Sequence, residues 1–367
     1  MCTASLWSGS SARRIPDIPD GIPDEKGERI EVDAPNYDSP EFVKALRLAW
    51  RGAKHMNSRN LHSTLTQWTK SIEKRHGAYP REVKELLGTI SPRTIDRVLK
   101  GYRAALKRQG GTKPGTLIKT EIPIQGSRWD VEVPGFLEAD TMAHCGDSLA
   151  GQFAWSLTMT DINTQWTECR VVWHKAAKAV VEQVKDIEKS LPFPMRGFDC
   201  DNGSEFLNNY LLAYFSEKRR SYDVNFAFTR SRPYHKNDNA LVEQKNWTHP
   251  RQLCGRVRLD CIEIVHMMND LYRNEFSLLR NHFYPNLKLR DKVRINSRYR
   301  RFYDKPKTPY QRVLEHQRID SDTKERLHAL HISLDPLSLQ DAVETKLRMI
   351  FSKFKALKRP LPQCLIA

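Results

Sequence analysis

Three acidic residues stand in sequence settings that suit a site for divalent cations. Asp140 lies within an apolar run, Asp201 directly precedes the turn-forming residues 202–203, and Glu243 follows the turn-rich segment 230–238. Magnesium takes oxygen ligands, and one or two carboxylates per ion together with phosphate oxygens suit it. Two such ions roughly 4 Å apart clamp the attacking and leaving oxygens of an in-line displacement at phosphorus. If the three carboxylates converge, they predict an enzyme that cuts and joins DNA.

Each of these acids alone also has an ordinary interpretation, because the chain holds 60 Lys and Arg residues with which an acid can pair. Strand alternation puts Glu138 and Asp140 on one face of a strand, and it does the same for Asp199 and Asp201. We expect Asp201 to be the ligand of the second pair, because ligands bind at the carboxyl ends of strands in open α/β sheets. Glu243 is expected on a helix that reaches over the edge of the sheet.

The segment that carries these acids, residues 117–256, alternates short strand-like runs with longer helical ones. Strands are expected at 137–144, 153–160, 166–173, 195–201 and 224–229, and helices at 175–190, 205–218 and from 239 onward. Three early strands, a crossover helix and later strands that alternate with helices are typical of an α/β protein with a mixed sheet. The three acids then fall on different elements.

The preceding region, residues 38–109, has the pattern of a helical DNA-binding unit. Apolar residues recur with helical spacing between 42 and 72, and two shorter helices follow, separated by a tight turn at 88–90. Ser91 and Pro92 form a typical helix start. The outward face of the last helix carries mostly cations, so we expect a helix-turn-helix in which Arg93, Arg97 and Lys100 contact DNA. A plain helical hairpin with a solvated face is the alternative. The inward positions of this helix are Ile95, Val98, Leu99, Tyr102 and Leu106.

A basic segment, residues 286–307, lies in the C-terminal region 257–367. Aromatic residues interleave with its cations, so the segment can follow a nucleic-acid backbone and stack on exposed bases. We expect DNA contacts from Arg298, Arg300 and Arg301, and the alternative is a solvated basic linker. Beyond it, residues 327–357 show helical apolar spacing, which ordinary packing explains.

Composition favours a polyanionic partner and no membrane association. The formal net charge of +16 and the pI near 9.5 make nucleic acid the leading candidate. Seven scattered cysteines without a Cys-x-x-Cys pair indicate reduced thiols. Residues 1–37 lack an apolar signal core and are expected to form a flexible leader. We expect a cytoplasmic protein associated with the nucleoid.

The ordered motifs around the acids resemble one family. Asp140, the run Phe198-Asp199-Cys200-Asp201-Asn202-Gly203-Ser204-Glu205-Phe206, and the segment 231–247 strongly resemble the integrase catalytic core of insertion-sequence transposases and retroviral integrases. The resemblance covers roughly residues 136–256. It implies a ribonuclease-H-like fold in which Asp140, Asp201 and Glu243 form an Asp-Asp-Glu triad that binds two Mg²⁺ or Mn²⁺ ions. The helix-turn-helix before the core and residues 305–312 after it are also similar to these transposases.

The resemblance implies a DNA transposase or integrase as the function. Water would first attack a phosphodiester at the transposon end, and the freed 3′-hydroxyl would then attack target DNA at the same site. The implied partner is double-stranded DNA, both transposon ends and target, bound by a homo-oligomer.

Two features depart from the retroviral pattern. The interval between Asp201 and Glu243 is longer, which indicates a longer loop before the glutamate helix, and the zinc-binding His-His-Cys-Cys module is absent, so helices must recognise DNA. Near the glutamate we expect phosphate contacts from five polar side chains, Arg230, Arg232, His235, Gln244 and Lys245. A solvated loop is the alternative.

Two other functions are compatible with the sequence. One is a sequence-specific DNA-binding regulator whose integrase-like core is catalytically inactive, although the intact acids favour catalysis. The other is a ribonuclease-H-like nuclease that only hydrolyses, which would cleave DNA without joining strands.

Overall fold

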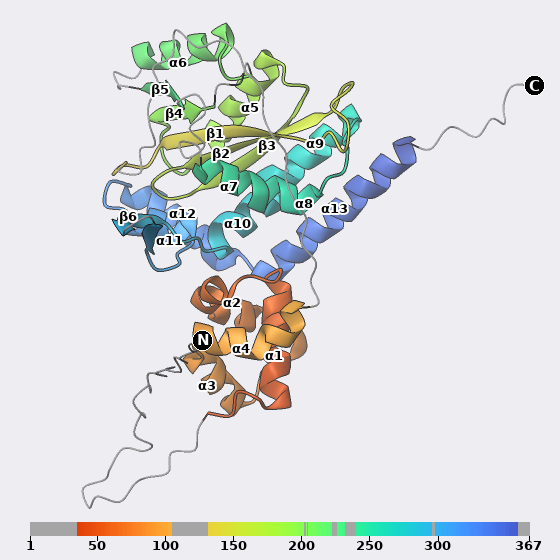
Figure 1. Cartoon of the computed structure of the whole chain (residues 1–367), viewed down its shortest axis with the longest axis vertical. Coiled ribbons are helices and arrows are strands. Elements are labelled where there is room, and N and C mark those ends of the chain that lie inside the picture. The colour runs from red at the N-terminus through yellow and green to blue at the C-terminus, as the bar shows by residue number, and fades with distance from the viewer. Residues whose placement is uncertain are drawn as a thin grey trace, which may run out of the picture.

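The computed structural model describes residues 35–104, 131–201, 203, 205–221, 226–231, 240–295 and 298–358. The expected leader therefore lies almost wholly outside the described residues, and so does the loop at 232–239. In the described part, an N-terminal helical region lies next to an α/β core, and a long C-terminal helix runs along both (Figure 1).

A five-stranded mixed sheet forms the centre of the core (Figure 1). Its first three strands pair antiparallel, whereas β4 runs parallel to β1 and β5 runs parallel to β4. The expected α/β class with a mixed sheet is confirmed. The strands are β1 (Phe136–Ala143), β2 (Ala154–Asp161), β3 (Thr167–Trp173), β4 (Gly197–Cys200) and β5 (Ala227–Arg230), in the order β3-β2-β1-β4-β5.

One face of the sheet is apolar and packs against two helices, α5 (Ala177–Ser190) and α6 (Asn209–Ser221) (Figure 1). Leu137 of β1 and Phe198 of β4 are buried there because strand residues alternate between the two faces. The ring of Phe198 lies 5.0 Å from that of Phe215 on α6, measured between centroids. This packing fixes β1 and β4 side by side, and these strands lead to the predicted catalytic aspartates.

Helices from later in the chain cover the opposite face. α7 (Ala240–Asn246) continues through a π-helical turn (Trp247–Arg251) into α8 (Gln252–Cys254), and α9 (Ile262–Leu271), a second π-helical turn (Tyr272–Phe276) and α10 (Ser277–Phe283) follow. Pro250 lies inside the first π-helical turn. Because proline has no backbone N–H, it removes a helical hydrogen bond, and a π turn is one way to absorb that loss. Since α9 and α10 pack on β3, the layer around the sheet extends beyond the expected core boundary at residue 256.

The N-terminal region consists of four helices, α1 (Pro40–Gly52), α2 (Ser58–His76), α3 (Arg81–Thr89) and α4 (Pro92–Ala104). Ser91 Oγ accepts a hydrogen bond from the Thr94 N–H at 3.1 Å, so the expected helix start at Ser91 is confirmed. Ile95 and Leu99 are fully buried, as predicted. Tyr102 was expected to point inward, but 38% of it is exposed, and the Arg47 guanidinium stacks on its ring at 4.0 Å.

The C-terminal region begins with an antiparallel hairpin that the sequence did not predict, formed by β6 (Leu289–Ile295) and β7 (Arg298–Tyr303). Three helices follow, α11 (Pro309–Glu315), α12 (Ser321–Ser333) and α13 (Pro336–Lys358). α13 packs against both α2 and α9 (Figure 1), with Val343 and Ile350 buried in the shared core. The apolar spacing of 327–357 therefore serves internal packing. Among the described helices, none combines the length and the apolar character that crossing a membrane requires.

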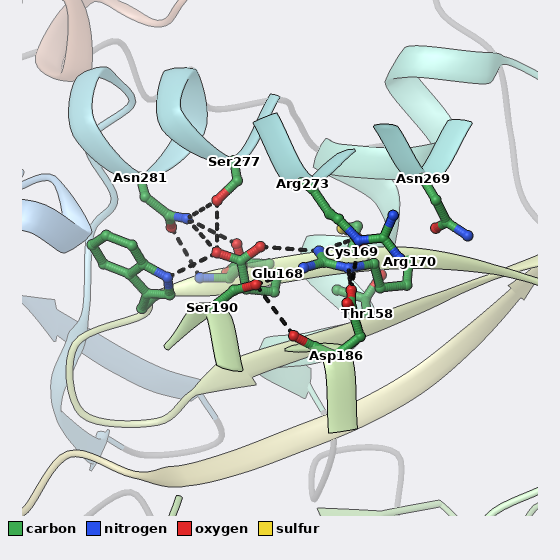
Figure 2. A network of polar contacts seen from close by, with 12 residues as sticks. Thr158, Glu168, Cys169, Arg170, Asp186, Ser190, Asn269, Arg273, Ser277 and Asn281 are labelled. Atoms are coloured by element: carbon green, nitrogen blue, oxygen red, sulfur yellow. Dashed lines mark hydrogen bonds and ion pairs between the residues drawn. The ribbon is translucent and has the colours of Figure 1, made fainter. Parts of the chain in front are cut away.

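A buried polar network ties the helical layer to β3 (Figure 2). Glu168 and Arg170 are 1% and 0% exposed, and Arg170 Nη1 lies 3.2 Å from Glu168 Oε2. The other oxygen of Glu168 accepts hydrogen bonds from Ser277 Oγ at 2.6 Å and from Trp166 Nε1 at 3.0 Å. Arg170 also pairs with Asp186 of α5. Burying a charge is costly unless it is paired and hydrogen-bonded, and in this buried network that condition is met.

Candidate active site at the edge of the sheet

Asp140 and Asp201 come from two neighbouring parallel strands. Ala139 of β1 stands opposite Cys200 of β4 in the register of the sheet, so the next residues along the two strands are these aspartates. Asp201 comes directly after the last residue of β4, which is the position expected for a ligand-binding side chain in such a sheet. The two carboxylates are therefore brought to one edge.

Two side chains dock α7 against this edge. Glu138 Oε2 accepts a hydrogen bond from the backbone N–H of Val242 at 3.2 Å, in the first turn of α7, where a carboxylate is favourable. Asn246 Nδ2 donates to Asp140 Oδ2 at 2.6 Å. Glu243 lies between these two anchored positions on the same short helix and is exposed. The helix therefore carries Glu243 to the aspartates.

The three predicted carboxylates act on one another electrostatically. Burial raises the pKa of Asp140 to about 8, and the charge of Asp201 adds to that rise, as does Glu243, while the Thr141 N–H opposes it. Burial also raises the pKa of Asp201, with Glu205 as the next contributor. We call the four carboxylates Asp140, Asp201, Glu205 and Glu243 the acidic edge.

The acidic edge has the donor chemistry for a divalent cation, but its carboxylates are not gathered around one point. Within the described residues, no three His, Cys, Asp or Glu side chains are grouped closely enough to hold one ion. The pKa values of Asp140 and Asp201 are nevertheless raised, first by burial and then by neighbouring carboxylates, and a bound divalent cation would favour the charged form of both. Oxygen-only donors from carboxylates suit Mg²⁺ or Mn²⁺, and the Glu243 side chain is exposed.

Three further side chains belong to this site, and sequence reasoning did not single them out. Thr141 Oγ1 donates to Glu205 Oε1 at 2.7 Å, and the Lys175 ammonium pairs with the same carboxylate. A Cβ at Gly203 would lie 2.5 Å from Glu205 Oε2 and 2.8 Å from Asp201 Oδ1, so any larger residue would have to displace these carboxylates. Glu205 is part of the motif that carries the family resemblance, but no local pattern predicted its burial or its partner.

The cations predicted on α4 are exposed, but not all of them are unpaired. Arg93, Arg97 and Lys100 line an open hollow of about 730 Å³ along α4. Arg97 Nη1 lies 3.0 Å from both carboxylate oxygens of Asp38. Arg93 and Lys100 have no acidic partner among the residues that the structure describes. The α4 surface thus presents exposed cations, of which Arg97 is paired with Asp38.

Two of the predicted DNA contacts near Glu243 are not placed for that role. Lys245 is 2% exposed, because successive helical residues are about 100° apart and this one turns toward the sheet. Burial lowers its pKa to about 7, and the charges of Arg280 and Arg312 lower it further. Arg230 is the last residue of β5, not part of an exposed loop, and is 6% exposed.

Gln244 remains exposed beside Glu243. Arg232 and His235 lie outside the described residues.

The β6–β7 hairpin exposes both cations and aromatic rings. Arg300 and Arg301 are exposed, and the Arg300 guanidinium lies 5.1 Å from the centroid of the Phe302 ring. Phe302 and Tyr303 are 40% and 48% exposed. The backbone of Arg298 belongs to β7, and its side chain lies outside the described part. A basic strand with exposed rings suits contact with phosphates and bases.

Comparison with known proteins gives one relative of this chain and no matching family model. That relative is "Uncharacterized protein y4rM" from Sinorhizobium fredii (strain NBRC 101917 / NGR234), which is 32% identical over 278 residues. The similar region spans 74% of this chain and 77% of the relative. Similarity at this level over most of both sequences indicates common descent, and the chain therefore belongs to the same family as the y4rM protein.

Proposed function

We propose that the protein is a DNA transposase or integrase that cleaves strands at transposon ends and transfers the resulting 3′-hydroxyl into target DNA. One observation carries this proposal: Asp140 within β1 and Asp201 directly after β4 belong to neighbouring parallel strands, and an anchored helix brings Glu243 within electrostatic range of both. Structural ion pairs also shift pKa values, but clustered carboxylates that raise one another's pKa values are typical of functional sites.

The fold is compatible with this proposal. A mixed five-stranded sheet with helices on both faces suits a ribonuclease-H-like core, which the motif resemblance implies. The site lies at the carboxyl end of β4, where open α/β sheets bind ligands. We therefore also propose that the core has a ribonuclease-H-like fold.

Asp140, Asp201 and Glu243 would hold two Mg²⁺ or Mn²⁺ ions. Such ions stabilise charge on the attacking and leaving oxygens at phosphorus. The protein's own part is to position these ligands. Asn246 orients the Asp140 carboxylate, Glu138 fixes the start of α7, and Gly203 allows Asp201 to approach Glu205.

Double-stranded DNA is the proposed partner, bound by a homo-oligomer. The net charge of +16 supports attraction to phosphates in general. More specifically, α4 presents Arg93 and Lys100, and the hairpin presents Arg300 and Arg301 beside exposed aromatic rings. In this proposal α4 contributes to end recognition and the hairpin follows the backbone.

The test uses labelled duplexes that carry the inverted repeats bordering the gene, together with a supercoiled target plasmid and Mn²⁺. Replacing Asp201 by Asn should reduce cleavage and joining by about a thousandfold or more, because residues that act as one catalytic unit are individually indispensable. Binding of the same duplex should persist. The matched control is Glu182→Gln, the same type of change at an exposed carboxylate of α5.

The assay also separates the two alternative functions. Cleavage by the wild-type protein without joined product would identify a hydrolytic nuclease, and binding without either reaction would identify a regulator. Full activity of the Asp201→Asn variant would refute the site assignment.

A further inference from the structure

Lys175 stands out because its ammonium lies among the carboxylates of the acidic edge. It pairs with Glu205, which is 3% exposed, while 32% of the Lys175 side chain remains exposed. Its charge also lowers the pKa of Asp140 and of Asp201. Lys175 thus supplies positive charge to a site that is otherwise acidic.

The surroundings of Lys175 allow its side chain a second position. The residue belongs to the short turn between β3 and α5, next to His174, whose φ of 54° is in the left-handed region. The ammonium lies 4.0 Å from the centroid of the Trp155 ring, an attraction that requires no fixed hydrogen-bond geometry. A long, half-exposed lysine on a turn can leave one carboxylate and reach another anion nearby.

Glu205, by contrast, is held in place. Thr141 Oγ1 donates to it at 2.7 Å, and it packs against Gly203 beside Asp201. Loss of the Lys175 partner would therefore leave a buried, fixed carboxylate next to Asp201. That arrangement attracts a cation, and the lysine and a divalent cation would compete for the same negative charge.

We propose that Lys175 is the internal counter-ion of the acidic edge. In the absence of a divalent cation its ammonium pairs with Glu205. When a divalent cation binds and displaces the ammonium, Lys175 binds a DNA phosphate. The inference rests on the proposed function because it takes Asp140 and Asp201 as metal ligands. It assigns Lys175 a positioning role before DNA binds and a phosphate contact afterwards.

The first test is calorimetric titration of the full-length protein with Mn²⁺ in the absence of DNA. Lys175→Met should tighten Mn²⁺ binding about tenfold, because it removes a positive charge that acts on Asp140 and Asp201 and repels the cation. Lys175→Arg keeps the charge and should leave the affinity near that of the wild type. The matched control, Lys178→Met, removes an exposed charge on α5 and should have a small effect.

Glu205→Gln gives the opposite expectation. It removes a negative charge and leaves the ammonium nearer Asp201, so Mn²⁺ binding should weaken. If Lys175 and Glu205 formed only a structural ion pair, both variants would lower the unfolding temperature without moving the Mn²⁺ affinity in opposite directions. That result would overturn the inference.

The second test measures DNA binding against salt concentration, with Ca²⁺ and with a chelator. A lost phosphate contact lowers the slope of log K against log salt by about one. Lys175→Met should lower the slope in Ca²⁺ and leave it unchanged in the chelator, where Glu205 holds the wild-type ammonium. Equal slopes for both proteins in Ca²⁺ would show that Lys175 does not contact a DNA phosphate.

The titration also separates failure of this inference from failure of the proposed function. If Asp140→Asn binds Mn²⁺ as tightly as the wild type, or if neither protein binds it, the metal site and the inference both fall. If Asp140→Asn abolishes binding while Lys175→Met leaves it unchanged, only the role of Lys175 is refuted.

Discussion

The acidic edge and the buried network around Glu168 are two groups of carboxylates on one sheet, and they differ in what neutralises them. Glu168 receives an arginine and several neutral donors, and Asp186 receives Arg170 and Arg273 (Figure 2). At the acidic edge, Asp140 and Asp201 accept hydrogen bonds from backbone N–H groups and from Asn246, while Lys175 is paired with Glu205.

This difference separates structural from functional charge. A buried carboxylate that is matched by an arginine fork has its partners permanently in place, so it fixes the packing of α5, α9 and α10 on β3. A carboxylate that is held near other acids by neutral donors has a raised pKa, and a bound cation would stabilise its charged form. We therefore expect changes in the buried network to affect stability, and changes at the acidic edge to affect activity and the response to metal ions.

The largest loss of stability is expected for Arg170→Met. The guanidinium is fully buried and pairs with Glu168 and Asp186. Its removal leaves the buried Glu168 carboxylate without this cationic partner and should lower the free energy of unfolding by about 3–5 kcal/mol. Urea denaturation measures the loss. Arg273→Met is the matched control, since this arginine contacts the same Asp186 while 41% exposed and should cost about 1 kcal/mol or less. Equal costs for the two variants would contradict the distinction between the two groups.

Asp140 should give the acidic edge a pH dependence of stability. Its pKa is raised from 3.8 to about 8 in the folded protein, so between these values the folded state binds more protons than the unfolded state. Stability then falls as pH rises through this window, by at most about 6 kcal/mol in total. Asp140→Asn should remove this loss, so the variant becomes progressively more stable than the wild type up to about pH 8.

Urea denaturation of both proteins from pH 5 to pH 9 in a chelator measures this difference. Excess Mg²⁺ should shrink it, because a bound cation favours the charged carboxylate. A difference that does not depend on pH would show that burial and the neighbouring carboxylates do not raise the pKa of Asp140.

The strands and helices that position Asp140, Asp201 and Glu243 were predictable because the spacing of their apolar residues matches the buried face of each element. β1 to β3 and α5 lie within a few residues of the expected ranges, since their apolar faces are buried against one another. The hairpin β6–β7 was missed although Val293 and Ile295 alternate with Lys292 and Arg294 in β6. The many cations of residues 286–307 favoured a nucleic-acid-binding segment or a basic linker as the interpretation.

The partners inside the site were less predictable than its acids. Lys175 and Glu205 are far apart along the chain, and no spacing rule brings a turn lysine to a buried glutamate. Similarly, Asp38 reaches Arg97 from another element and neutralises a cation that helical periodicity had correctly turned outward. Sequence periodicity predicts on which face of a helix or strand a residue lies, whereas tertiary contacts determine its interaction partner.

Replacing Lys245 should have the smallest effect on stability. This lysine is buried but belongs to neither the acidic edge nor the network around Glu168, so it tests whether the difference between these two groups extends to other buried charges. Its pKa is lowered from 10.5 to about 7, first by burial and then by Arg280 and Arg312. Between these values the unfolded state binds more protons, so the lysine lowers stability at pH 7, and this penalty fades as pH rises toward 10. Lys245→Met should therefore stabilise the protein by at most about 4 kcal/mol at pH 7 and by less at pH 10.

Urea denaturation at the two pH values measures this effect, with Lys178→Met as the exposed control that should change stability by about 0.5 kcal/mol or less. DNA binding by Lys245→Met should match the wild type, because a side chain enclosed between the sheet and α10 does not reach a phosphate. Weaker DNA binding together with lower stability would mean that the ammonium has an anionic partner when DNA is bound. Lys245 would then join Lys175 as a cation that the acidic edge and its DNA require.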